Sequence, residues 1–178
     1  MNYFIQSLTY FRIFIAPAIF ILITLFDSYG WALFLFFLAS ISDYWDGFLA
    51  RKYKLESMIG AVLDPIADKI LITFIILALS IELSSSFVGF IGGIILVREF
   101  WVGALRELNA RNGNDSATKV SKLAKIKTTT QFFAFTGFLF GLYLNNSLIL
   151  FSSNFLLLLA LIITLQTGLS YTIATFKR

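Results

Sequence analysis

Four aspartates stand in apolar sequence that is long enough to cross a membrane. Asp43 and Asp46 come near the end of one apolar segment, and Asp64 and Asp68 come near the start of the next. Ionisable side chains inside such segments are costly, so the default interpretation is that they have a function. The i,i+3 and i,i+4 spacings place each pair of carboxylates on one face of a helix.

An antiparallel helical hairpin would bring the two pairs together. The loop between the segments, Arg51–Met58, has its midpoint near residue 55, nine positions after Asp46 and nine before Asp64. Asp43 and Asp68 lie twelve and thirteen positions from the same point. Residues equally far from a turn lie at equal depth, because each helical residue advances the chain by the same rise. The four carboxylates are therefore predicted to converge.

Four carboxylates at one point repel one another, and a hard divalent cation removes that conflict. The chain has no His and no Cys, so a metal site must use oxygen ligands, which favour Mg²⁺, Mn²⁺ or Ca²⁺. Four carboxylates suit two ions about 3.5–4 Å apart, an arrangement that holds a phosphoryl group during in-line displacement. The alternative is that each aspartate pairs with a nearby cation, for which Lys69, Arg51 and Arg98 are the candidates.

The composition is that of a membrane protein. Of the 178 residues, 58% are hydrophobic and 13% are charged, and the mean hydropathy is +0.85. An average soluble domain is about 25% charged, and a soluble core of this size would leave too much apolar surface exposed. The length allows a single domain, residues 1–178, in one helical bundle.

The charged residues divide the chain into six predicted transmembrane helices, since a span needs about 20 apolar residues. The predicted fold class is therefore an all-α integral membrane bundle. The uncharged run between Thr128 and Phe176 holds two spans, separated by the polar turn Leu144–Ser147. The other four are predicted at Leu8–Phe26, Gly30–Ala50, Ile59–Ile81 and Phe87–Leu108.

The distribution of Lys and Arg predicts the orientation. The connections after the first, third and fifth spans contain neither residue: Asp27–Tyr29, Glu82–Ser86 and Asn145–Asn154. All 14 basic residues lie on the other side or in span ends that face it. The positive-inside rule therefore places both termini and the carboxylates at the cytoplasmic face. Attraction to anionic lipid explains the net charge of +4 without nucleic acid.

Small residues surround the carboxylates or stand at helical spacing. Gly47, Ala50 and Gly60 adjoin the aspartates, where a missing side chain lets a bulky group approach the backbone. Gly89-x3-Gly93 and Gly137-x3-Gly141 are typical of close helix packing, which is also the alternative for the first three.

Together these residues form a pattern that resembles the signature of the CDP-alcohol phosphotransferase family. That resemblance implies six transmembrane helices, a homodimer, and transfer of a phosphatidyl or similar group from a CDP-linked donor to an alcohol. It implies two Mg²⁺ or Mn²⁺ ions on the four aspartates, with Asp68 also acting as the general base. Gly47, Ala50, Arg51 and Gly60 would hold the CDP part. The pattern is Asp43-x2-Asp46-Gly47-x2-Ala50-Arg51-x8-Gly60-x3-Asp64-x3-Asp68.

Further short motifs accompany this pattern. They are Thr9-x2-Arg12-x4-Pro17, Ser42, Leu63-Asp64-Pro65-x-Ala67-Asp68-Lys69, Arg98-Glu99-Phe100, Leu105-Arg106 and Lys125-x-Lys127-Thr128-x2-Gln131. These motifs resemble the phosphatidylglycerophosphate synthase branch of that family. The branch implies CDP-diacylglycerol as donor and sn-glycerol 3-phosphate as acceptor, at the cytoplasmic membrane, with Thr9 and Arg12 as candidate substrate contacts. Gln6 and Ala124 depart from the branch, which usually has Asn and Gly at these positions.

A phosphate-bearing acceptor needs fixed cations, and Arg can bind its oxygens in a bidentate manner. Arg98, Arg106, Lys125 and Lys127 are the predicted acceptor-phosphate ligands. For Lys125 the alternative is attraction to anionic lipid. For Arg98 it is neutralisation by the adjacent Glu99 or by an aspartate.

Other functions stay open. Within the same chemistry, the acceptor could be an inositol phosphate, serine, or phosphatidylglycerol, as in a cardiolipin synthase. A divalent-cation transporter would use the aspartates as its binding site. Transporters of that kind usually have repeated halves and a site at the bilayer midplane, and the sequence shows neither.

The predicted orientation can be tested with single cysteines, because the chain has none of its own. Cysteines placed at Ser28, Ser85 or Asn146 are expected to react with a membrane-impermeant maleimide added outside the cell. Cysteines at Ser57 or Asn114 are expected to react only after the membrane is permeabilised. Labelling in the reverse pattern would contradict the orientation.

Overall fold

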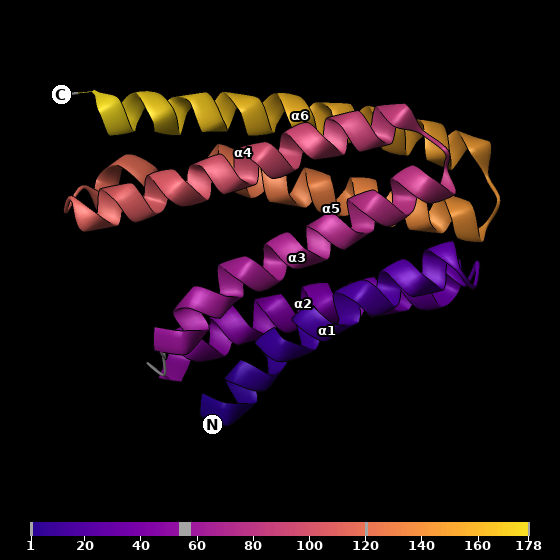
Figure 1. The fold of residues 1–178 in the computed structure, drawn as a ribbon, viewed down its shortest axis with the longest axis horizontal. Helices are drawn as coiled ribbons and strands as arrows, with labels where there is room; N and C mark the ends of the chain where they lie inside the picture. The colour runs from indigo at the N-terminus through magenta and orange to yellow at the C-terminus, as the bar shows by residue number, and fades with distance from the viewer. Residues whose placement is uncertain (1, 54–57, 120, 178) are drawn as a thin grey trace. The chain divides into compact units, whose positions relative to one another are not determined.

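The structure, a computed structural model, describes the backbone of residues 2–53, 58–119 and 121–177. The described side chains exclude residues 2–6, 44, 46–53, 58–59, 61–62 and 115. Within these ranges the chain is helical between short connections (Figure 1), in the order α1 (Asn2–Thr24), α2 (Tyr29–Tyr53), α3 (Met58–Glu82), α4 (Ser86–Arg111), the 3₁₀ helix η1 (Asp115–Thr118), α5 (Lys122–Tyr143) and α6 (Ser147–Phe176).

The described helices confirm the all-α class, and their bounds follow the sequence prediction closely. The largest differences are at α1, which begins six residues before the predicted Leu8, and at α2 and α4, which continue three residues beyond Ala50 and Leu108. The predicted turn at 144–147 is also confirmed. Asn145 has a positive φ of 50°, and the Asn146 side chain caps α6 by accepting hydrogen bonds from two backbone N–H groups.

Among the described residues, three helical segments are both long and apolar enough to cross a membrane: Ser7–Thr24, Ser86–Arg111 and Ser147–Phe176. The apolar part of α2, Tyr29–Asp43, is shorter. The other two helices carry more charge: α3 contains Asp64, Asp68 and Lys69, and α5 has three lysines among its first six residues. That all six helices cross the membrane stays a prediction.

The chain forms two compact units. Unit 1 comprises Met1–Ser85 and Leu142–Asn145. Its contacts run from α1 to α2 and from α1 to α3, so α1 is the helix that joins the other two. Small side chains allow this close packing, with the buried Ala16 of α1, Ala32 and Ala39 of α2, and Ala67 of α3.

Unit 2 comprises Ser86–Gly141 and Asn146–Arg178. In it α4 packs along α6, and a buried cluster of Val102, Leu105, Ala124 and Tyr171 joins α4, α5 and α6.

The prediction of close helix packing has different outcomes at the two glycine pairs, Gly89/Gly93 and Gly137/Gly141. A methyl group on Gly137 would collide with Ser153, and one on Gly141 would collide with Leu150, so close packing of α5 on α6 is confirmed. The same prediction is wrong at Gly93, where an added methyl group would have no described atom within 4 Å.

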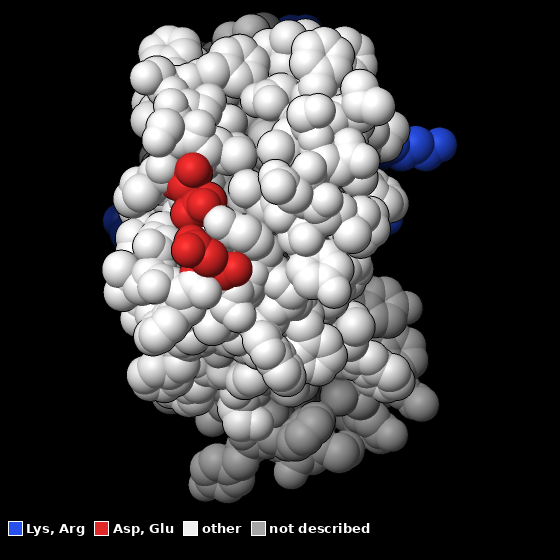
Figure 2. Space-filling view, turned by 90° about the vertical axis from the view of Figure 1, so that its right-hand side faces the viewer, with Lys and Arg blue, Asp and Glu red and all other residues white. Residues whose placement is uncertain are grey.

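Acidic residues lie where α1 and α3 end: Asp27 in the connection after α1, and Glu82 as the last residue of α3. The Tyr29 hydroxyl group lies 2.5 Å from the Glu82 carboxylate and 3.4 Å from that of Asp27. Figure 2 shows a face on which acidic side chains gather in one patch, while Lys and Arg appear only at the margins. This charge distribution agrees with the connections from which the orientation was predicted.

Candidate metal and phosphate sites

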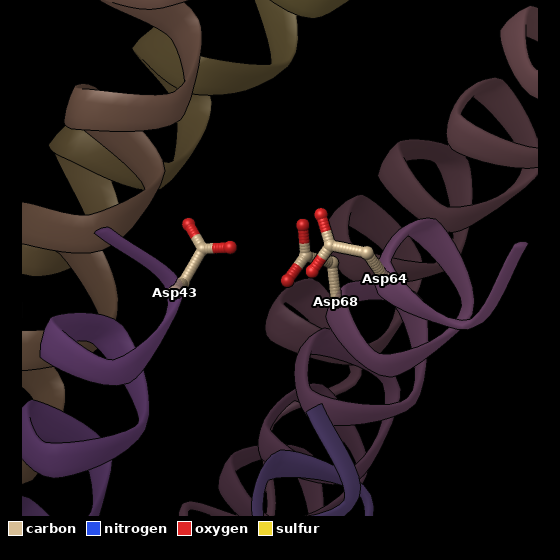
Figure 3. Close-up of side chains that lie close together, drawn as sticks. All are labelled: Asp43, Asp64 and Asp68. Carbon is tan, nitrogen blue, oxygen red and sulfur yellow. The ribbon is translucent and has the colours of Figure 1, made fainter. Parts of the chain in front are cut away.

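Three of the four aspartates converge as predicted. Asp43 on α2 and the pair Asp64 and Asp68 on α3 turn their carboxylates toward one another (Figure 3). One oxygen of each lies within 4.8 Å of the others. Asp46 lies on α2 as well, but its side chain is outside the described residues.

The local sequence explains this arrangement. Asp64 and Asp68 are four residues apart, so their side chains leave α3 on the same face. Ala67, in the same turn, is fully buried within unit 1. The three carboxylates remain about half exposed, at 44–48% of the side-chain surface. They are therefore open to a ligand on one side.

A buried arginine lies on the other side of the cluster. The Arg12 side chain of α1 has no exposed surface. Its Nη1 donates to Asp43 Oδ1 at 2.6 Å and to Asp68 Oδ1 at 2.5 Å, and its Nη2 donates to Asp64 Oδ1. A cation that pairs with the aspartates was the alternative hypothesis, but Arg12 was not among its candidates.

One feature of the sequence could have identified Arg12 as this partner. It is the only charged residue of α1, and a guanidinium group inside an apolar helix needs an anion. Thr9, the other candidate substrate contact, lies one turn before Arg12 and is also buried, at 1% exposure. Both residues are therefore buried, and Arg12 lies on the buried side of the carboxylates.

The described cluster fits a hard divalent cation. Counted as ions, three carboxylates and one guanidinium group carry a net charge of −2. The donors are all oxygen atoms, which Mg²⁺ and Mn²⁺ prefer. The half-exposed carboxylates leave space for a ligand on the side away from Arg12.

The residues predicted to hold the CDP part lie close to this cluster along the chain. Gly47, Ala50 and Arg51 occupy the last turns of α2, and their side chains are outside the described residues. Gly60 is half-buried in the first turn of α3.

A second group of charges lies in unit 2. Arg98 and Lys127 are buried, at 6% and 8% exposure, and Glu99 bridges them. Glu99 Oε1 accepts from Lys127 Nζ at 2.5 Å and from Arg98 Nη1 at 3.0 Å. The alternative in which Glu99 neutralises Arg98 is thus observed, and the same carboxylate also holds Lys127.

Further contacts to α6 fix the Arg98 guanidinium group. Its Nε donates to the Thr164 carbonyl at 2.8 Å, and its Nη2 donates to Thr167 Oγ1 at 2.6 Å. The stem of Arg98 lies against Gly168, where an added Cβ would be 3.2 Å from the Arg98 Cγ and Nε. A glycine at this position therefore makes room for the arginine.

The other two predicted phosphate ligands, Arg106 and Lys125, are exposed. The four basic residues thus differ in character. Two are fixed in a buried ion network that joins α4 and α5, and two reach the surface of the same unit.

Comparison with known proteins gives a family and close relatives. Residues 6–166 match the CDP-alcohol phosphatidyltransferase family. The chain is 32% identical over 92% of its length to proteins from Salmonella choleraesuis strain SC-B67 and Escherichia coli strain K12, and covers 90% of each. It is 34% identical to a protein from Sodalis glossinidius over 71% of both chains. All three relatives are named CDP-diacylglycerol–glycerol-3-phosphate 3-phosphatidyltransferase.

The bridging role of Glu99 can be tested by measuring the free energy of unfolding. Glu99→Gln is expected to lower the free energy of unfolding by about 3–5 kcal/mol, because two buried cations lose their shared anion. Glu107→Gln is the matched control, since its ion pair with Arg111 is exposed and is worth about 0–1 kcal/mol. Denaturant unfolding in detergent measures both variants. Equal losses in the two would contradict the bridge.

Proposed function

Because the chain belongs to the CDP-alcohol phosphatidyltransferase family, we propose that it transfers the phosphatidyl group of CDP-diacylglycerol to sn-glycerol 3-phosphate. The products are phosphatidylglycerophosphate and CMP. The observation that carries the proposal is the convergence of Asp43, Asp64 and Asp68 on a half-exposed point within unit 1. The names of the relatives support this donor and this acceptor.

The aspartates would hold Mg²⁺ or Mn²⁺. Asp43, Asp64 and Asp68 form the described part of this site, and Asp46, three residues after Asp43 on α2, completes the set. Four carboxylates suit two ions. When bound, these ions supply Lewis-acid stabilisation to the pyrophosphate of the donor and to the departing CMP.

Asp68 is the proposed general base. Its half-exposed carboxylate takes the proton from the 1-hydroxyl group of the acceptor. The acceptor oxygen then forms a bond to the β-phosphorus of the donor, and the bond from that phosphorus to the oxygen bridging to CMP breaks. Gly47, Ala50, Arg51 and Gly60 are proposed to bind the CDP part, where small residues let the nucleotide approach the helix backbone. With no His and no Cys, the transfer cannot pass through a covalent phosphohistidine or thiol intermediate.

The basic residues of unit 2 are proposed to bind the phosphate of the acceptor. Arg98 and Lys127 are already held in place by Glu99, so little side-chain freedom is lost when they bind an anion. Arg106 and Lys125 add exposed positive charge. Serine has no phosphate dianion for these cations, and phosphatidylglycerol would arrive through the bilayer. An inositol phosphate fits the charges equally well, and the relatives favour glycerol 3-phosphate.

The proposed setting is the cytoplasmic membrane, with six spans and with both termini and the active site facing the cytoplasm. Three helical segments are long and apolar enough to cross a membrane, and large apolar side chains such as Phe14 and Phe151 are three-quarters exposed on the helices. The connections without Lys or Arg support the orientation. A homodimer in contact with membrane lipids is proposed from the resemblance to the family.

The acceptor can be identified by CMP release. Purified protein with CDP-diacylglycerol and Mg²⁺ is expected to release CMP with glycerol 3-phosphate, and little with serine, inositol phosphate or phosphatidylglycerol. Arg98→Ala and Lys127→Ala are expected to raise the KM for glycerol 3-phosphate far more than the KM for the lipid donor. Faster release with another alcohol would contradict the acceptor, and no release with any alcohol would favour the cation transporter.

The carboxylates can be tested one at a time. Asp68→Asn is expected to lower kcat by about 10²–10⁴-fold, the usual effect of removing an acid–base group. Replacement of Asp43, Asp46 or Asp64 by Asn should also weaken metal binding, so that excess Mg²⁺ restores part of the activity. Asp27→Asn is the control, because Asp27 lies on the connection after α1 and outside the cluster. Near-normal activity in all four cluster variants would contradict the metal site.

A further inference from the structure

Arg12 makes its ion pairs with the same carboxylates that would bind the metal. It contacts one oxygen, Oδ1, of each of Asp43, Asp64 and Asp68. The guanidinium group has no exposed surface, while the carboxylates are about half exposed. The cluster therefore has an internal cation on its buried side and an open side toward a ligand.

The position of α1 explains why one arginine can reach all three carboxylates. Asp43 leaves α2, and the other two aspartates leave α3. Since α1 packs against both of these helices, a long side chain from α1 can bridge them. The planar guanidinium group presents several N–H donors in fixed directions, and here Nη1 serves two carboxylates while Nη2 serves the third.

We propose that Arg12 is a positioning residue that acts as an internal counter-cation. It holds the three aspartates together, and its positive charge offsets part of the negative charge that would attract a divalent cation to the open side. This inference rests on the proposed metal site. It adds a role for a residue that the reaction itself does not require to touch the substrate.

Two opposite effects follow from the charges. Without Arg12, the described carboxylates carry three negative charges instead of a net two, so they attract a divalent cation more strongly. The same carboxylates then repel one another when no metal is bound. Loss of Arg12 should therefore tighten metal binding and lower the stability of the metal-free protein.

Other roles for Arg12 make different predictions. A salt bridge with a purely structural role would lower the stability with and without metal by the same amount and leave the affinity unchanged. An arginine that orients the aspartates for the metal would weaken metal binding when it is removed. The direction of the change in affinity therefore separates the three roles.

The experiment is a titration of purified, metal-free protein in detergent with Mn²⁺, followed by electron paramagnetic resonance of the free ion. Arg12→Gln is expected to lower the Kd for Mn²⁺ by about tenfold, which corresponds to about 1.4 kcal/mol. Arg12→Lys keeps the charge but cannot make the same set of contacts. Its Kd for Mn²⁺ is therefore expected to lie between that of the original protein and that of Arg12→Gln. Arg111→Gln removes an exposed arginine of unit 2 and should leave the Kd unchanged.

Thermal unfolding is the second readout. The difference between the Tm in saturating Mn²⁺ and the Tm in EDTA is expected to be larger for Arg12→Gln than for the original protein. This follows because a ligand that binds only the folded state stabilises it in proportion to the logarithm of its affinity. If Arg12→Gln does not fold, Arg12→Lys carries the same test.

An unchanged or higher Kd in the variant that folds would overturn the inference while the metal site stands. Absence of Mn²⁺ binding in the original protein would instead overturn the metal site of the proposed function. The two failures are therefore distinguishable.

Discussion

The pairing of buried charges is the constraint on which the site depends. Removing a guanidinium group from water costs several kcal/mol, and the cost is offset only if anions with good geometry meet it. Arg12 meets three such anions, which come from two different helices. The packing of α1 against both α2 and α3 is therefore linked to the charges as well as to the small buried alanines. A shift of α1 away from α3 would separate Arg12 from two of its three partners, and a shift away from α2 would separate it from the third.

Buried charges are also paired in unit 2, but there two cations share one anion. Its buried charges are the cations Arg98 and Lys127, and a single anion, Glu99, lies between them. Each cluster keeps an excess of one sign, negative in unit 1 and positive in unit 2. The first therefore favours a metal cation, and the second favours a phosphate anion. Partial compensation within each unit lets the protein fold with these charges in place before any ligand binds.

Local sequence features predicted the helices and the convergence of the aspartates. Charged and polar residues interrupt the apolar sequence at intervals, so the helix bounds were correct to within a few residues at most ends. The spacing of Asp64 and Asp68 and the equal distances from the intervening loop were sufficient to predict that carboxylates meet. Such arguments succeed because they use only the geometry of a helix and of one connection.

The ion pairs of Arg12 were beyond such reasoning. They join residues 31, 52 and 56 positions apart, and they depend on which helix packs beside which. The bridge from Glu99 to Lys127 is of the same kind, since its partners lie 28 positions apart on α4 and α5. At Gly93 the error is of the opposite kind, because the sequence predicted a close contact that the structure does not show. A small residue at helical spacing permits close packing but does not require a neighbouring helix.

The carboxylate cluster of unit 1 and the basic residues of unit 2 are consistent with chemistry that uses only oxygen ligands and fixed charges. A chain without His or Cys has no imidazole or thiolate side chain, and in the proposed reaction its carboxylates would serve both as metal ligands and as a base. A carboxylate can do both only where a ligand can reach it, and the three described ones are half exposed above a fully buried cation. In the proposed reaction the donor and the acceptor each bring negative charge to the membrane surface. Metal ions on the aspartates would compensate the negative charge of the donor. The fixed cations of unit 2 would compensate that of the acceptor.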